Sequence, residues 1–193
     1  MPRAAEWLND YLEKQIRPQN VVGETDRRWR PADLTPVKIN VDAACFEGRG
    51  TGWGVVVRDE EGRCLLAGVK RSRIHWEPDL AEAKAIEYGL ELARRFSWLE
   101  VEMESDCLGV IHTIRREEEG RTELGCLCAT LRAQAQDLVK VIRNFTGRGK
   151  NQVAHAMAQV EGNWGEKDIW VDNPPIFIVP LLREDLFTNS DST

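Results

Sequence analysis

The sequence predicts an α/β fold: a five-stranded mixed sheet, with three antiparallel strands followed by two parallel ones, covered by helices. Residues Val37–Asp42 and Leu99–Ser105 alternate strictly between apolar and polar side chains, which is typical of strands with two different faces. Only short connections follow the first alternating run, whereas a helical segment precedes the second. A hairpin meander that continues into strand–helix–strand crossovers forms one mixed sheet.

Each predicted element has a local justification. The elements are, in order, strands at 37–42, 53–58 and 64–69, a helix at 78–96, a strand at 99–105, helices at 107–118 and 122–137, a strand at 138–145 and a helix at 151–161. The polar residues 59–62 form a turn between the second and third strands. Pro78 and Asp79 are favoured at a helix start, and Asn151 is a good N-cap.

The segments on either side are predicted to be extensions of a domain at 37–162. In residues 1–36, apolar residues at helical spacing precede a polar stretch with prolines, which indicates an N-terminal helix and a linker. Residues 163–193, with two adjacent prolines and a polar end, are assigned to a C-terminal tail. The length of 193 residues suits one domain with two extensions.

Charge and hydropathy argue against several classes of protein. The net charge of −6 disfavours a simple nucleic-acid-binding protein, because neutralising phosphates requires a basic face. An enzyme whose metal ions supply positive charge remains compatible with it. No apolar run approaches the roughly 18 residues of a membrane span, and the N-terminus lacks the apolar core of a signal peptide. We therefore expect a soluble, intracellular protein with no membrane partner, in either the nucleus or the cytoplasm.

The five cysteines are scattered along the chain and odd in number. No Cys-x-x-Cys pair is present, and the three histidines do not complete a zinc-ligand pattern. We interpret these cysteines as reduced packing residues, and we expect no small-molecule cofactor.

Three carboxylates are predicted to meet at one end of the sheet. Asp42 lies near the end of the first strand, and Asp106 directly follows the fourth. If these strands are neighbours, the two side chains can meet, because sites in such sheets form at strand ends. Glu82 lies in the first turn of the helix, on its apolar, sheet-facing stripe, where an unpaired charge costs several kcal/mol. A divalent cation shared by the three residues would compensate this charge.

Each of these residues alone has an ordinary structural explanation. Asp42 suits a turn or a cap, Glu82 suits the positive end of a helix, and Asp106 suits an N-cap. Their combination, in this order and at these element positions, is far more specific and favours a metal site. Hard oxygen ligands are those that Mg²⁺ prefers.

Four motifs resemble those of plant retroelement-type ribonuclease H domains, which accompany non-LTR reverse transcriptases. The motifs are Asn40-Val41-Asp42-Ala43-Ala44 with Gly52–Asp59, Ala81-Glu82-Ala83-Lys84-Ala85-Ile86, Glu104-Ser105-Asp106-Cys107 and Asn151–Ala158. The similarity covers residues 37–160. It implies a ribonuclease H-like fold.

The resemblance implies an endonuclease that hydrolyses the RNA strand of RNA–DNA hybrids with two Mg²⁺ or Mn²⁺ ions. Asp42 matches the aspartate that bridges both metals, Glu82 the first-helix glutamate on one metal, and Asp106 the strand-end aspartate. The family often has a fourth acid in the last helix, where this chain has His155. Imidazole brings no negative charge and is a poorer partner for Mg²⁺. His155 is either a general base or product-release shuttle, or a helix residue chosen for packing or exposure.

Substrate contacts are predicted from two glycines and from a basic loop. Gly52 and Gly54 either let a nucleic-acid backbone approach closely or serve ordinary turn chemistry. Arg148 and Lys150 precede Asn151 near the expected site, and they either hold phosphate or form a solvated loop pair. We assign all five residues to nucleic-acid binding as a hypothesis.

Three alternatives to an active hybrid nuclease stay open. A catalytically weak or inactive retroelement-derived domain that binds nucleic acid is favoured by the acidic balance and by His155. A protein-interaction module would dock a protein partner through the N-terminal amphipathic segment. An exonuclease- or integrase-like member of the same fold is the third, because fold alone does not fix function.

Overall fold

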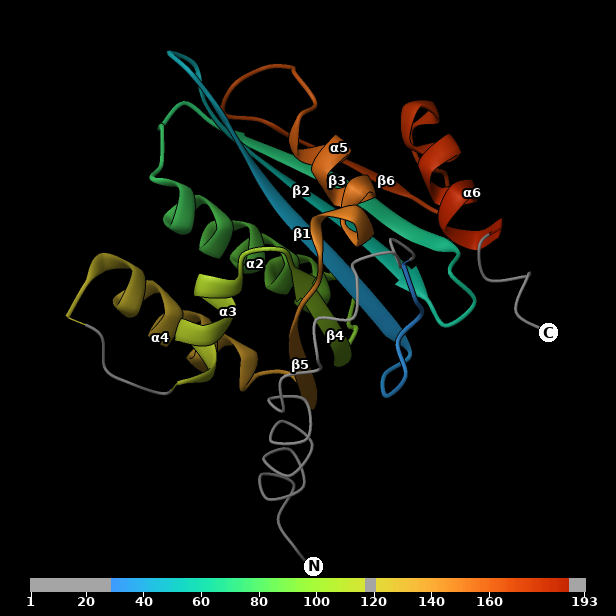
Figure 1. Ribbon diagram of the computed structural model, residues 1–193, viewed down its shortest axis with the longest axis horizontal. Helices are drawn as coiled ribbons and strands as arrows, with labels where there is room; N and C mark the ends of the chain where they lie inside the picture. Colours follow the sequence, from blue (N-terminus) through green and yellow to red (C-terminus); the bar gives the residue numbers. More distant parts are fainter. Residues whose placement is uncertain (1–28, 117–120, 188–193) are drawn as a thin grey trace, which may run out of the picture.

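A computed structural model describes residues 29–116 and 121–187 of the chain (Figure 1). Its elements are β1 (Val37–Phe46), β2 (Gly50–Asp59), β3 (Cys64–Ser72), α2 (Pro78–Arg95), β4 (Glu100–Ser105), α3 (Leu108–Arg115), α4 (Glu123–Ala135), β5 (Lys140–Phe145), η1 (Arg148–Lys150), α5 (Gln152–Ala158), β6 (Lys167–Val171), η2 (Ile176–Ile178) and α6 (Val179–Phe187). The first hairpin is longer than its sequence pattern predicted, and α5 is shorter.

The strands form one mixed sheet in the order β5-β4-β1-β2-β3-β6. β2 pairs antiparallel with β1 and with β3 across short connections, whereas β4 pairs in parallel with β1 and with β5. α2 and the α3–α4 pair form the crossovers that parallel neighbours require. The predicted α/β class, with three antiparallel strands followed by two parallel strands, is confirmed.

The sheet contains a sixth strand, so the predicted number of five is wrong. β6 pairs antiparallel with β3, and it lies in the segment that the sequence assigned to the C-terminal tail. Its residues are exposed or half-buried at the sheet edge, so the apolar alternation that marks a strand over a core is weak. Further along, Ile178 of η2 and Leu182 of α6 pack with buried residues of β2 and β3.

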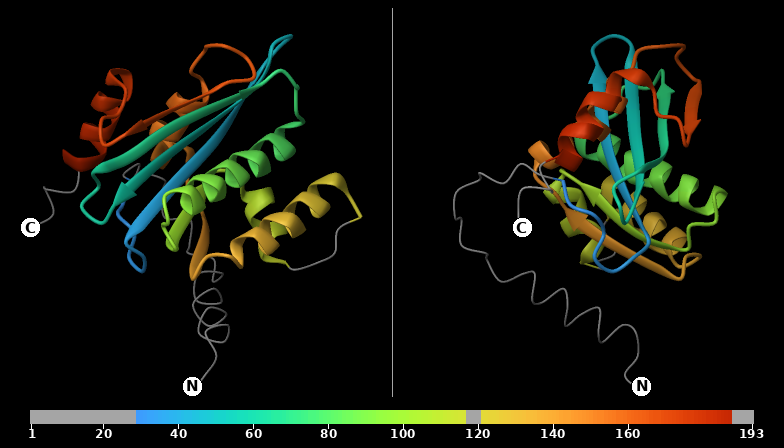
Figure 2. Two further views of the ribbon diagram at one scale, coloured as in Figure 1. Left: turned by 180° about the vertical axis from the view of Figure 1, so that it is seen from behind. Right: turned by 90° about the vertical axis from the view of Figure 1, so that its right-hand side faces the viewer.

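Helices cover both faces of the sheet. α2, α3 and α4 lie on one face, and α5 and α6 lie on the other (Figures 1 and 2). The larger core lies under α2 and includes Ile39 and Val41 of β1. Gly89 lets α2 approach the sheet, because a Cβ there would lie 2.9 Å from the Met103 sulfur and 3.0 Å from a methyl carbon of Val41. This close packing fixes the position of α2, and with it Glu82, beside β1.

The last part of the predicted linker packs against the sheet. Trp29 is fully buried, with the Arg58 guanidinium 3.7 Å from the centre of its ring, and its indole N–H donates to Asn40 Oδ1 at 2.9 Å. The predicted N-terminal helix falls within residues 1–28, outside the described residues. Among the helices that are described, none is long and apolar enough to cross a bilayer.

Candidate metal site

Two strands and one helix bring Asp42, Glu82 and Asp106 together. β1 and β4 pair in parallel as far as Asn40 and Glu104, and Asp42 and Asp106 each lie two residues further along. Glu82 enters from the start of α2, which packs on β1 and β4. The three carboxylates that the sequence predicted to meet therefore do so in the structure.

The geometry of this acidic cluster suits a shared cation. One carboxylate oxygen from each of the three residues lies within 4.8 Å of the other two. Asp42 is 3% exposed, and the side chain of Asp106 is 11% exposed. Glu82 Oε2 is buried and has no hydrogen-bond partner within residues 29–116 and 121–187. Three carboxylate oxygens at this spacing, together with an unsatisfied oxygen on one of the three residues, fit a hard divalent cation such as Mg²⁺ or Mn²⁺.

Burial and mutual repulsion raise two pKa values in the cluster. Burial raises the pKa of Glu82 from 4.5 to about 9, and the charges of Asp42 and Asp106 add to the shift. Burial raises the pKa of Asp42 from 3.8 to about 6, Asp106 adds to this, and a hydrogen bond with His155 opposes it. The surrounding side chains therefore leave the ionised cluster undercompensated, and a bound divalent cation would supply the missing charge.

His155 contacts Asp42 and is not one of the three residues whose oxygens converge. Its Nδ1 lies 2.7 Å from Asp42 Oδ2, and its Nε2 lies 3.0 Å from Gln159 Nε2. The Gln159 amide can only donate from that nitrogen, so Nε2 accepts, and Nδ1 carries the proton that it donates to Asp42. The Gln159–His155 pair thus orients the Asp42 carboxylate, as outer partners of metal ligands do.

Comparison with known protein families identifies the family to which the chain belongs. Residues 40–160 match the family model described as reverse transcriptase-like. The chain belongs to the reverse transcriptase-like family. Its sequence matches none of the curated proteins with which it was compared.

The fold of this reverse transcriptase-like domain is shared with solved ribonucleases H. RNase H1 of the archaeon Halobacterium salinarum is 19% identical, with a TM-score of 0.59 over 63% of this chain and 93% of that chain. LC11-RNase H1 in complex with an RNA/DNA hybrid is 20% identical, with a TM-score of 0.56 over 63% and 92%. A foamy viral protease–reverse transcriptase in complex with dsDNA is 12% identical, with a TM-score of 0.53 over 64% and 92%. The predicted ribonuclease H-like fold is thereby confirmed.

The basic loop of the reverse transcriptase-like domain is divided between two places. Arg148 lies beside the acidic cluster, with its Nε 3.5 Å from Asp106 Oδ2. Lys150 instead lines a separate cavity of about 240 Å³. Asn151 is buried, and its amide donates to the Val41 carbonyl at 2.9 Å rather than capping α5. The predicted direct contact between Asn151 and substrate is therefore wrong, because this buried side chain joins α5 to β1.

Gly52 and Gly54 do not offer their backbone to a substrate, which corrects a second prediction. A Cβ at Gly52 would lie 2.4 Å from the Ala158 carbonyl oxygen, and a Cβ at Gly54 would lie 2.3 Å from the Ala154 carbonyl oxygen. Both glycines are buried beneath α5. Their missing side chains let α5, and with it His155, approach the sheet.

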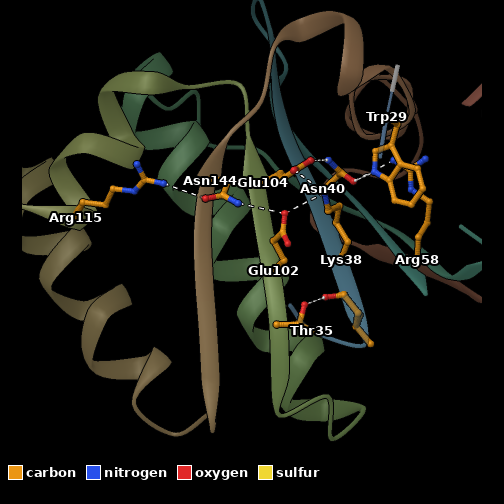
Figure 3. Close-up of polar contacts among 10 residues, drawn as sticks. Trp29, Thr35, Lys38, Asn40, Arg58, Glu102, Glu104, Arg115 and Asn144 are labelled. Atoms are coloured by element: carbon orange, nitrogen blue, oxygen red, sulfur yellow. Dashed lines mark hydrogen bonds and ion pairs between the residues drawn. The ribbon is translucent and has the colours of Figure 1, made fainter. Parts of the chain in front are cut away.

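An ionic network joins β1 to β4 next to the acidic cluster (Figure 3). Lys38 Nζ lies 3.0 Å from Glu102 Oε1 and 2.8 Å from Glu104 Oε1. Asn40 Nδ2 donates to Glu104 Oε2 at 3.0 Å. All four side chains are buried. The network therefore holds the two strands together at the last residue pair before the candidate metal ligands.

Trp29 and Arg58 orient Asn40 within this network. Both donate to Asn40 Oδ1, at 2.9 Å and 3.0 Å, which leaves Nδ2 facing Glu104 (Figure 3). Sequence analysis missed these contacts, because they join residues far apart in the chain. It also missed Gln159, although a spacing of four residues from a histidine on one helix is a signal for such a pair.

Proposed function

We propose that this chain is a divalent-metal-dependent endonuclease that hydrolyses the RNA strand of RNA–DNA hybrids. The observation that carries the proposal is the acidic cluster of Asp42, Glu82 and Asp106, whose ligand oxygens converge within 4.8 Å. The raised pKa values of Asp42 and Glu82 mark a charge excess that a dication would relieve. The unpaired, buried Glu82 Oε2 supports the same interpretation.

The three carboxylates would hold Mg²⁺ or Mn²⁺. Bound there, the metal would activate a water and stabilise the leaving 3′-oxygen, and two ions are expected in an active enzyme. His155 keeps Asp42 in place by donating its Nδ1 proton. Because imidazole adds no negative charge, the second ion should bind more weakly than the first.

Arg148 is the residue that we assign to substrate at the cluster. Its side chain is 84% exposed and lies beside Asp106, where a phosphate of the cleaved strand would arrive. Lys150 stays a predicted phosphate contact in the adjoining cavity. Among the structural neighbours, LC11-RNase H1 was solved with an RNA/DNA hybrid, which supports the choice of substrate.

A second candidate is a retroelement-derived domain of the plant type that binds nucleic acid without cleaving it. His155, in the position of a fourth acid, and the net charge of −6 favour it. The motif resemblance fits both candidates equally. They therefore differ in one measurable property, which is hydrolysis.

Cleavage of a labelled RNA–DNA hybrid in the presence of Mg²⁺ or Mn²⁺ tests the proposal. We expect metal-dependent cutting of the RNA strand by the wild type and none by the Asp42→Asn variant. An Asp137→Asn variant, which alters an exposed carboxylate on another part of the surface, should cut like the wild type. Absence of cutting by a folded wild-type protein with either metal would overturn the hydrolytic proposal, and retained binding of the hybrid would then support the non-cleaving candidate.

A further inference from the structure

A basic pocket of about 470 Å³ lies between the first half of α2, the start of β2 and the end of β3. Four of the side chains that line it are cationic and one is acidic; they are Lys70, Arg71, Arg73, Lys84 and Glu87. This excess of positive charge contrasts with the net charge of −6 of the whole chain. Clustered cations on an acidic protein indicate a site for an anionic ligand.

The cations of the basic pocket are available to a ligand to different degrees. Arg71 is buried, and its guanidinium is bound to the Val160 carbonyl oxygen and to Asp168 on the α5 face of the sheet, so its charge is not offered to the pocket. Arg73 is exposed, and among the described residues the one hydrogen-bond acceptor of its Nε is the Trp164 carbonyl oxygen, at 3.4 Å. A guanidinium so weakly held can turn to a phosphate and bind it through two N–H groups.

The two lysines of the pocket have partners that water weakens. Lys84 lies 2.9 Å from a Glu87 oxygen, and Lys70 lies 3.2 Å from a Glu91 oxygen. All four side chains are between 26% and 39% exposed. Ion pairs of this kind contribute only about 0–1 kcal/mol, so a phosphate can exchange for the carboxylate at little cost.

Two tryptophans give the basic pocket rigid walls. Trp53 is 6% exposed, and its indole N–H donates to the Ala81 carbonyl at 2.9 Å. Trp76 is half-buried, with Lys84 Nζ 5.5 Å from the centre of its ring, and its buried indole N–H has no partner in the part of the chain that the structure describes. A buried hydrogen bond therefore fixes one wall of the pocket, and the other wall holds an unsatisfied donor in addition to the cations.

The basic pocket is a direct neighbour of the acidic cluster. Ala43, Trp53 and Lys70 lie side by side across β1, β2 and β3, and Ala43 directly follows Asp42. Adjacent strands are about 4.8 Å apart, so Lys70 starts roughly 10 Å from β1 at this level. When one phosphate of a nucleic-acid strand lies at the acidic cluster, other phosphates of the same nucleic acid lie about this far away and can reach the basic pocket.

We propose that the basic pocket binds a backbone phosphate of the same nucleic acid whose scissile phosphate lies at Asp42, Glu82 and Asp106. This inference rests on the proposed function for its choice of nucleic acid over other polyanions. The pocket holds a phosphate away from the point of cleavage. It thereby supplies affinity that the acidic cluster cannot supply.

Binding of a labelled RNA–DNA hybrid in EDTA, measured by fluorescence anisotropy at several salt concentrations, tests the proposal without cleavage. We expect the Arg73→Gln/Lys84→Gln double variant to bind about tenfold more weakly, because each lost cation–phosphate contact is charge-assisted. The slope of log affinity against log salt should fall by about 1 or more. The control is Arg121→Gln/Arg183→Gln, which removes two exposed cations elsewhere on the surface.

Two further measurements, of Mn²⁺ affinity and of polyglutamate binding, separate the possible outcomes. Mn²⁺ affinity should be unchanged in the Arg73→Gln/Lys84→Gln variant, since neither residue belongs to the acidic cluster. Equal losses in the test and control variants, or no loss in either, would overturn the proposal, as would equally tight binding of polyglutamate. If only the test variant loses binding while the wild type cuts no hybrid, the basic pocket stands and the hydrolytic function fails. If the wild type cuts and the test variant binds normally, the hydrolytic function stands and the proposal for the basic pocket fails.

Discussion

Glu104 and Asp106 stand two residues apart at the end of β4, yet their carboxylates have opposite surroundings. Glu104 accepts from Lys38 and Asn40, and Glu102 shares the same lysine. Asp106 points instead toward two further carboxylates, and its cationic contact is an exposed arginine. The ionic network offsets much of its buried charge with Lys38 and the Asn40 amide, although burial and Glu104 still raise the pKa of Glu102, whereas the acidic cluster contains no cation of its own.

This difference separates structural from functional carboxylates. A buried carboxylate that has a built-in cation and hydrogen bonds stabilises the arrangement of its strands, and it needs nothing from outside. A group of buried carboxylates that repel one another destabilises the free protein until a cation binds. The acidic cluster therefore has the energetics of a binding site, and the neighbouring ionic network has those of a structural support.

The largest expected effect comes from removing the cation of the ionic network. Lys38→Met keeps most of the side-chain volume but leaves Glu102 and Glu104 buried without their cation, so we expect a loss of about 3–5 kcal/mol in the free energy of unfolding. Urea denaturation measures it. The control Lys167→Met breaks an exposed pair with Glu91 and should cost less than about 1 kcal/mol. Equal costs would show that the network does not depend on its buried lysine.

Addition of a divalent metal should act on the acidic cluster alone. At a hundred times its dissociation constant, Mg²⁺ or Mn²⁺ that binds only the folded state raises the free energy of unfolding by about 2.7 kcal/mol. Glu82→Gln should lose most of this gain, whereas Lys38→Met, though less stable, should keep it. A gain of the same size in the wild type and in Glu82→Gln would place the metal elsewhere.

The pH dependence of the metal-free protein should follow the raised pKa values of the cluster. Protonated Asp42 and Glu82 fit the folded state better than their ionised forms, so this contribution is complete below about pH 4 and is lost as pH rises. The loss runs through the folded pKa of Asp42, about 6, and that of Glu82, about 9.

Denaturation in EDTA between pH 5 and 9 checks this dependence. Stability of the wild type should fall with rising pH. Glu82→Gln should remove the alkaline part of the fall and raise stability near pH 8 by about 1–3 kcal/mol. Saturating Mg²⁺ should flatten the wild-type profile. A flat metal-free profile, identical in both proteins, would contradict the assigned electrostatics.

The sequence predicted the acidic cluster because its three residues each have a strong local pattern. Asp42 and Asp106 end alternating strands, and Glu82 begins the apolar stripe of α2, so periodicity alone placed them at one end of a sheet. Trp29 lies in a polar, proline-containing stretch, and β6 is short and half-exposed, so neither has such a pattern. Both are fixed by contacts with distant strands, which a local pattern does not report.

The same reason explains the error at Gly52 and Gly54. A glycine permits close approach, but the sequence does not say what approaches. In the structure it is the backbone of α5, which arrives through a connection of more than ninety residues, and not the substrate. The chemistry of the site was thus predictable where it depended on local patterns, and the supports of the site were not.

The smallest expected effect tests how far the ionic network influences the candidate metal site. Trp29→Phe keeps an aromatic ring for stacking on Arg58 but loses the N–H that donates to Asn40, so it should cost about 1 kcal/mol of stability. Arg58 still donates to Asn40 Oδ1, so the amide keeps its direction toward Glu104. The Mn²⁺ affinity should then stay within about twofold of the wild type, which is under 0.5 kcal/mol. A tenfold weaker Mn²⁺ affinity at nearly unchanged stability would mean that both donors are needed to hold the last pair of β1 and β4 in register, and that the network positions the metal ligands as well as bracing the strands.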